Sequence, residues 1–141
     1  MAYTTIDDPL QYFNTVLYTG NGGSQNITGV GFSPDWVWLK GRNNANNNNL
    51  NDKVRGANKQ LYSDLQNAET TATTHLTSFD SDGFTLGNDG AVNGSSDTYV
   101  SWNWLASGST ASNTDGSITS TVSANTTAGF SIVSYTGTTG G

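Results

Sequence analysis

The chain has 141 residues, a length typical of one domain and short for two. Only 33% of its residues are apolar, but four Trp, six Tyr and five Phe can build a core, which argues against a disordered chain. The net charge of −6 disfavours nucleic acid as a partner, and the absence of Cys excludes disulfides and thiolate metal sites. No signal peptide and no segment of membrane-spanning length is visible, so we expect folding in a cytoplasm and no membrane insertion.

The first forty residues predict β-strands separated by polar turns. Residues 1–12 are polar and contain Asp7-Asp8-Pro9, so we expect an N-terminal arm before a body over 13–106. A strand begins at Phe13 and ends at Tyr18, before a glycine-rich turn. The apolar run from Trp36 to Leu39 predicts a strand covered on both faces, with Trp36 and Trp38 on the same face because side chains alternate.

The next segment combines an Asn-rich loop with all the positive charge of the chain. Residues 41–49 are almost wholly Gly, Arg and Asn, which predicts an exposed loop without core residues. Residues 50–69 allow a short helix or a hairpin that turns near Gly56, and we favour the hairpin. The cations either pair with Asp52, Asp64 and Glu69, which we favour, or form a patch for an anionic partner; they are Lys40, Arg42, Lys53, Arg55 and Lys59.

The second half of the chain continues the strand pattern. Two strands, 75–79 and 83–87, flank the tight Asp80-Ser81-Asp82 turn, and the strand over 98–106 places Val100, Trp102 and Trp104 on one face. Residues 107–128 predict a polar linker with one thin strand. Because no long amphipathic helix is visible, we predict an all-β chain, a two-sheet antiparallel β-sandwich.

The chain also contains an internal repeat. The pattern Phe13-x-x-Val16-x-Tyr18-Thr19-Gly20 returns as Phe130-x-x-Val133-x-Tyr135-Thr136-Gly137, and a later Gly matches as well, Gly23 with Gly140. Residues 129–141 therefore repeat the first strand, either as a closing strand of the same domain or as the start of a second module in a tandem array. Such a strand can pair with a sheet edge in a neighbouring module or subunit, which makes Phe130, Val133 and Tyr135 the assembly candidates.

Several sequence motifs resemble those of the repeated modules of marine bacteriophage virion proteins, including tail-fibre-like proteins. They are Gly31-Phe32-x-Pro34-Asp35-Trp36-Val37-Trp38, Val54-Arg55-Gly56-Ala57, Leu76-Thr77-Ser78-Phe79-Asp80-Ser81-Asp82-Gly83-Phe84, Thr98-Tyr99-Val100-x-Trp102-Asn103-Trp104 and Asn113-Thr114-Asp115-Gly116-Ser117-Ile118. The resemblance implies a lectin-like sandwich of the jelly-roll, concanavalin or SPRY type. It also implies location in the virion after folding in the host cytoplasm. The partners that it implies are other virion proteins, and we expect a homo-oligomer.

The inventory of catalytic and metal-ligating residues is poor. With one His and no Cys we expect no enzyme, and His75 lies on a predicted strand where a structural role is favoured. Asp80 and Asp82 are better explained as caps of their own turn than as a glycosidase acid pair. The same two carboxylates are weak candidates for Ca²⁺ because a third ligand is missing, so we expect neither metal nor cofactor.

Two surfaces remain as binding candidates. We expect one or both Trp-x-Trp pairs to pack the two sheets together, with a carbohydrate platform as the alternative. The Asn-rich loop is the stronger candidate for envelope polysaccharide, through Lys40, Arg42, Asn46, Asn48 and Arg55. The sequence thus favours a non-enzymatic virion structural module of a tail or capsid fibre, and leaves open an adhesin that recognises bacterial envelope glycans.

Overall fold

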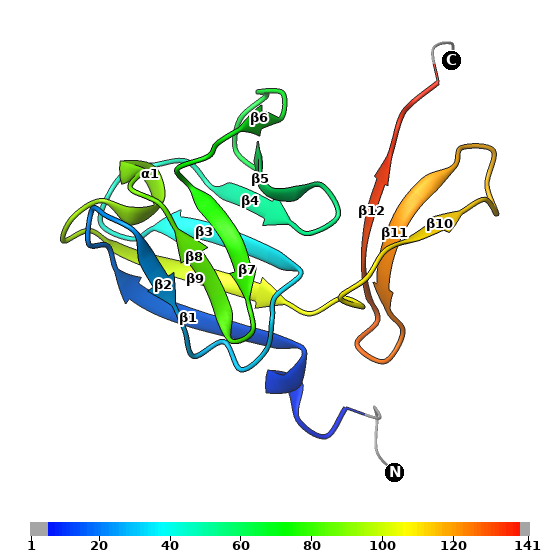
Figure 1. Cartoon of the computed structure of the whole chain (residues 1–141), viewed down its shortest axis with the longest axis horizontal. Helices are drawn as coiled ribbons and strands as arrows, with labels where there is room; N and C mark the ends of the chain where they lie inside the picture. The colour runs from blue at the N-terminus through cyan, green and yellow to red at the C-terminus, as the bar shows by residue number, and fades with distance from the viewer. Residues whose placement is uncertain (1–5, 139–141) are drawn as a thin grey trace.

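The chain folds into antiparallel β-sheets in a computed structural model that describes residues 6–138 (Figure 1). The largest sheet has six strands in the order β1-β9-β3-β4-β5-β6. These strands are β1 (Phe13–Thr19), β3 (Trp36–Gly41), β4 (Asn49–Asp52), β5 (Gly56–Tyr62), β6 (Thr70–Thr71) and β9 (Thr98–Trp104). A three-stranded sheet in the order β2-β8-β7 packs on it: β2 (Gln25–Ile27), β7 (Leu76–Asp80) and β8 (Gly83–Leu86). The predicted all-β, two-sheet antiparallel sandwich is confirmed.

The core lies between these two sheets. Its buried members are Ile27, Val37, Leu39, Leu76, Phe84, Leu86 and Val92. Tyr18 and Tyr99 stack beside it with ring centroids 5.1 Å apart, and Tyr18 Oη donates to the Val92 carbonyl at 2.8 Å. Val92 belongs to α1 (Gly90–Asn93), a single helical turn capped by Asp89. Burial holds the pKa of the Tyr18 hydroxyl well above its usual value, so that group remains a hydrogen-bond donor.

A third sheet follows the sandwich and stands to one side of it (Figure 1). Its three strands are β10 (Ala111–Asn113), β11 (Ser120–Asn125) and β12 (Phe130–Tyr135), paired as a meander with β12 at one edge. We predicted one thin strand over 117–122 in a linker, but segment 107–128 contains both β10 and β11. The predicted thin strand overlaps β11 at residues 120–122, whereas β10 was not predicted, because its Ala, Ser and Asn residues show no alternation and pairing with β11 is what defines it.

Both Trp-x-Trp pairs lie on the face of the large sheet opposite the core, so the prediction that they pack the two sheets together is wrong. Trp36 pairs with Trp104 and Trp38 with Trp102 across β3 and β9, and all four alternate with the core-facing side chains. On β3 both alternating sets are apolar, so the sequence alone could not show which set faces the second sheet.

The predicted hairpin is present, but its turn precedes Gly56, which is the first residue of β5. β4 and β5 pair with a register shift between Asn51 and Asp52, and the short turn 53–55 joins them. In the arm, Asp8 accepts a hydrogen bond from the Leu10 amide and caps η1 (Pro9–Gln11). Residues 1–5 of the arm, and Gly140 of the repeat, lie outside the described residues.

The Asp80-Ser81-Asp82 turn joins β7 to β8 as predicted. Asp82 caps a different loop: its carboxylate accepts the amides of Gly31 at 2.6 Å and Gly29 at 3.0 Å. Asp80 accepts from the hydroxyls of Ser78 and Thr85 on its own hairpin. Gly83 has φ +145°, and a Cβ there would lie 2.0 Å from the Ile27 carbonyl oxygen, so only glycine fits this position.

We expect Asp82→Ala to destabilise the protein at neutral pH and to have a shrinking effect in acid. Hydrogen bonds from the amides of Gly31 and Gly29 lower the pKa of the Asp82 carboxyl in the folded protein. The carboxylate therefore makes its full contribution to folding stability above the pKa of the unfolded chain, about 4. That contribution is lost as the pH falls through the lower pKa of the folded protein. Urea unfolding midpoints of parent and variant, measured between pH 7 and pH 2.5, should converge at the acid end. Asp115→Ala, which removes a local contact only, is the control; a constant gap across this range would contradict the expectation.

Candidate functional site

The face of the six-stranded sheet turned away from the core is an apolar surface, here called the outer face. Its aromatic centre is formed by the Trp36–Trp104 and Trp38–Trp102 pairs, with ring centroids 5.6 and 5.5 Å apart. β1 adds Phe13 and Leu17, which are 36% and 61% exposed. Leu50 and Leu61, paired across β4 and β5, extend the surface on the other side. An antiparallel sheet with one solvated face would carry polar residues there, so this composition indicates that the outer face is a contact surface.

β12 covers one end of the outer face. Phe130 stacks on Trp36 with ring centroids 5.6 Å apart and on Trp104 at 6.1 Å. Ile132, two residues further along the strand, is also buried. The assembly candidate Phe130 is therefore already in contact with the sandwich of its own chain.

The opposite face of β12 carries the other two assembly candidates. Val133 is 50% exposed and Tyr135 66% exposed, and both are large apolar side chains without a cover in the described part of the chain. Their counterparts in the repeat, Val16 and Tyr18 on β1, pack against the core of the sandwich. β12 therefore presents to solvent the face that β1 buries.

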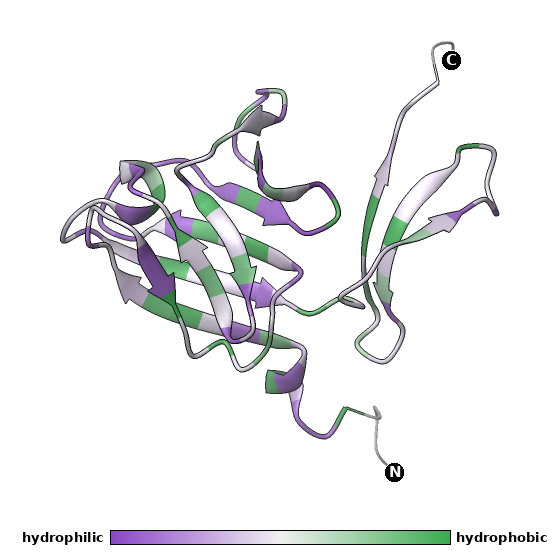
Figure 2. Ribbon diagram, in the orientation of Figure 1, coloured by the Kyte–Doolittle hydropathy of each residue, from purple (hydrophilic) through white to green (hydrophobic). Residues whose placement is uncertain are grey.

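A groove of about 430 Å³ separates the outer face from β12. Trp36, Leu50 and Leu61 line it on the sheet side, and Ile132, Val133 and Tyr135 line it on the strand side. The Asp52–Arg55 pair borders it, with Arg55 Nε 2.6 Å from Asp52 Oδ2. Figure 2 shows apolar residues on β12 as well as on the strands of the sandwich.

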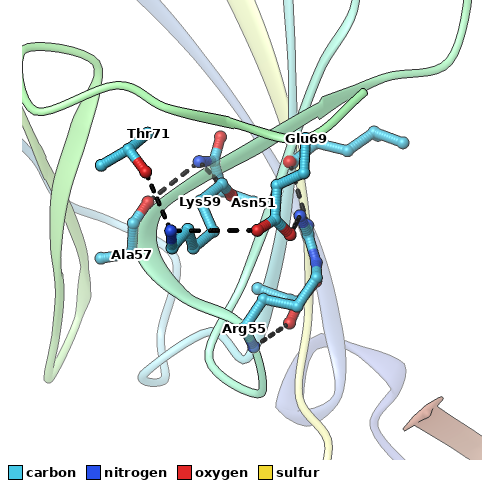
Figure 3. Close-up of polar contacts among 8 residues, drawn as sticks. Asn51, Arg55, Ala57, Lys59, Glu69 and Thr71 are labelled. Atoms are coloured by element: carbon cyan, nitrogen blue, oxygen red, sulfur yellow. Dashed lines mark hydrogen bonds and ion pairs between the residues drawn. The ribbon is translucent and has the colours of Figure 1, made fainter. Parts of the chain in front are cut away.

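Arg55 and Lys59 are engaged in the chain's own ion pairs, as we predicted for the cations of this segment. Arg55 Nη1 lies 3.1 Å from Glu69 Oε2, and Lys59 Nζ lies 4.0 Å from the other oxygen of the same carboxylate (Figure 3). Arg55 also donates to the Leu50 carbonyl, and Lys59 to Thr71 Oγ1. The network braces the β4–β5 hairpin against the segment that leads into β6.

The proposed glycan-binding residues are not brought together in one place. Lys40, Arg42, Asn46 and Asn48 lie at the Gly41 end of β3, whereas Arg55 follows Asp52, which pairs with Trp36 at the opposite end. A strand of this length separates the two ends by about 16 Å. The Asn-rich loop and Arg55 therefore lie at opposite ends of the strands of this sheet.

Within the loop, most of the candidate side chains bond inward. Lys40 Nζ donates to the Asn46 carbonyl, and Asn46 Nδ2 donates to the Gly90 carbonyl at 3.1 Å. Asn48 accepts from Trp38 Nε1 and donates to Asp64, an acid that we had expected to pair with a cation. Asn49 is buried, which corrects the expectation of a wholly exposed loop. Arg42 is exposed and forms no ion pair within residues 6–138.

His75 lies one residue before β7 rather than on the strand, and it contacts the residue that caps α1. Its Nε2 lies 2.8 Å from Asp89 Oδ2, and the second oxygen of Asp89 caps α1 by accepting from the Ala91 amide. Residues 6–138 contain no group of three or more His, Asp and Glu side chains that could hold a metal ion. In the same range no helix is both long and apolar enough to cross a membrane.

The residue that sequence reasoning missed is Asp35. It is fully buried, its Oδ1 lies 2.9 Å from Lys53 Nζ, and its Oδ2 accepts the amides of Ala106 and Gly108 at 2.8 and 3.0 Å. Asp35 thus ties the start of β3 to the β4–β5 turn and to the connection that leads out of β9. The sequence did contain one indication of this role: a carboxylate directly before an apolar strand tends to be buried, and a buried carboxylate needs a cation or hydrogen-bond donors beside it.

Residues 8–141 match the model of a domain of unknown function, DUF7483. The chain belongs to this family. The match covers both the sandwich and the β10–β12 sheet, so the family domain includes the two together. No curated protein and no solved structure matches the chain.

Proposed function

We propose that this DUF7483 domain is a non-enzymatic structural module of a bacteriophage virion, part of a tail or capsid fibre, whose task is to dock with other virion proteins. The phage context comes from the resemblance of its sequence phrases to virion modules. The docking role has a separate, structural support in β12.

The observation that carries the proposal is the mismatch between the two copies of the repeat. β1 buries Val16 and Tyr18 against the core, and β12 exposes the matching Val133 and Tyr135. Exposing both side chains has a free-energy cost that a partner surface removes, at about 25 cal/mol per Å² of apolar area covered. β12 is also an edge strand of its sheet, so its backbone can pair with another strand. A strand with one uncovered apolar face and one free edge is suited to assembly.

We expect the double variant Val133→Asp/Tyr135→Asp to weaken self-association. Sedimentation velocity of the full chain over a wide concentration range should show concentration-dependent growth in mass, and the variant should form smaller assemblies than the parent at the same concentrations. Because both side chains are at least half exposed, the melting temperature of the variant should stay close to that of the parent.

The matched control is Leu65→Asp, which charges an apolar side chain that is 41% exposed and lies outside both β12 and the outer face. It should assemble like the parent. A parent chain that stays monomeric throughout, or a Val133→Asp/Tyr135→Asp variant that assembles like the parent, would contradict docking between copies of this chain through β12.

A second candidate function is a carbohydrate-binding adhesin, and the groove beside β12 favours it. The residues that line the groove include Trp36, Tyr135 and the charged Asp52–Arg55 pair, residue types that can stack on a sugar ring and bond its hydroxyls. Titration with envelope polysaccharides, with and without Ca²⁺, tests this. Saturable binding that Tyr135→Ala removes and Arg42→Ala retains would place the glycan in the groove rather than at the Asn-rich loop.

A further inference from the structure

The outer face remains only partly covered within residues 6–138. β12 covers the end at Trp36 and Trp104, but Leu17 on β1 stays 61% exposed, and Trp38 and Trp102 are half-buried. These side chains neighbour one another across β1, β9 and β3, because Thr15 pairs with Trp102 and Leu17 with Val100. A contiguous apolar surface of this kind marks an interaction site.

The chain itself shows what such a surface accepts. The residues of β12 that face the sheet, Phe130 and Ile132, correspond in the repeat to Phe13 and Thr15, which lie on the outer face of β1. β12, whose sequence repeats that of β1, therefore packs on the outer face through the side that corresponds to the outward side of β1. In this contact Phe130 lies against Trp36 and Trp104.

From this we infer that the open part of the outer face docks the outer face of a second copy of this chain, so that two sandwiches pack back to back. The inference rests on the proposed assembly function and names a surface for it other than the exposed side of β12. Contacts of this kind are isologous, with the same patch used by both copies. Leu17, Trp38 and Trp102 form its centre.

The charges around the outer face permit this contact. Arg55 is paired with Asp52 and Glu69, whereas Lys40 donates to the neutral Asn46 carbonyl and keeps its positive charge at the Gly41 end of β3, away from Trp36 and Trp104. The net charge of −6 on each copy still opposes association at long range. Raising the salt concentration should therefore strengthen the pairing, because it screens this repulsion and leaves apolar contacts intact.

The test uses a single thiol on the open part of the outer face. The chain contains no Cys, so Leu17→Cys provides a unique thiol on β1, and Leu65→Cys provides a matched thiol in a loop. The alkylation rate of each thiol is measured with iodoacetamide in dilute and in concentrated solution, with the mass followed by sedimentation. We expect alkylation of Leu17→Cys to slow at least fivefold on association, and that of Leu65→Cys to stay constant.

The outcomes separate this inference from the function on which it rests. If the mass rises with concentration but the Leu17→Cys thiol reacts at an unchanged rate, the back-to-back contact is refuted and docking through β12 stands. If the mass does not rise, the back-to-back contact and the association of copies through β12 are both refuted. As a second readout, Leu17→Asp should raise the dissociation constant of self-association at least tenfold and leave the melting temperature near that of the parent, because Leu17 is largely exposed in one copy.

Discussion

Asp35→Ala is expected to lower the free energy of unfolding by about 3 to 5 kcal/mol, the range found when one partner of a buried ion pair is removed. The variant leaves Lys53 without its carboxylate in a site where only 27% of its side chain is exposed. It also leaves the buried amide of Ala106 without an acceptor. Thermal and urea unfolding, followed by circular dichroism, measure the loss.

The effect should extend beyond the sandwich. Asp35 holds the amides of Ala106 and Gly108, which begin the connection between β9 and β10. When these bonds are lost, the β10–β12 sheet is held mainly by Phe130 on the Trp surface. Amide hydrogen exchange in β11 and β12 should therefore accelerate in Asp35→Ala even under conditions where the sandwich remains folded.

A double-mutant cycle provides the control for Asp35. Lys53→Met removes the charge that Asp35 faces, and the double variant Asp35→Ala/Lys53→Met should be more stable than the sum of the two single losses predicts. Asp64→Ala, which removes an exposed carboxylate, should cost much less than Asp35→Ala. Equal losses in the free energy of unfolding for Asp35→Ala and Asp64→Ala would show that the buried contacts of Asp35 do not stabilise the fold.

Phe84→Ala is expected to cost about 3 to 5 kcal/mol, the usual range for removing a buried aromatic ring. Phe84 is fully buried on β8 and contacts Tyr18 edge to face, with ring centroids 6.5 Å apart. The vacated space is enclosed by both sheets, so the lost burial is joined by the cost of a cavity. Chemical denaturation measures the difference.

Trp102→Ala is the informative comparison. Although Trp is the larger side chain, Trp102 lies half-buried on the outer face, where its removal leaves an open depression rather than a closed cavity. We therefore expect Trp102→Ala to destabilise a single copy less than Phe84→Ala does, and to weaken self-association. If Trp102→Ala proved the more destabilising change in dilute solution, the placement of the core between β3 and β8 would be wrong.

Strand positions were the part of the fold most accessible from sequence. The alternating segment around Trp102 and the run around Val37 both form strands, and the Asp80-Ser81-Asp82 turn lies where its residues predicted it, whereas the β4–β5 hairpin turns at 53–55, just before Gly56. These features are local, since the period of the pattern and the chemistry of the turn residues decide them. β10 has no such pattern and was missed, and β11 was predicted only in part.

The candidate site was less accessible. Phe130, Val133 and Tyr135 were recognisable from the repeat, but which of them would be covered was not. The residues predicted to bind glycan lie at two ends of β3. The sequence could not show this separation, because it contains no information on the strand register between Arg55 and the Asn-rich loop. The importance of Asp35 was hidden for the same reason: its partners, Lys53 and Ala106, are distant in sequence.

The sequence by itself determined the all-β character, the pairing of Trp36 with Trp38 on one side of their strand, and the kinship of the first and last strands, because alternation and repetition are properties of the chain. Tertiary structure decided which side of β3 became the core and which became the outer face. Val37 and Leu39 face the second sheet, and the larger Trp rings stack across β3 and β9 on the other side. Both sides of the strand are apolar, so only the packing of the second sheet and of β12 could distinguish them.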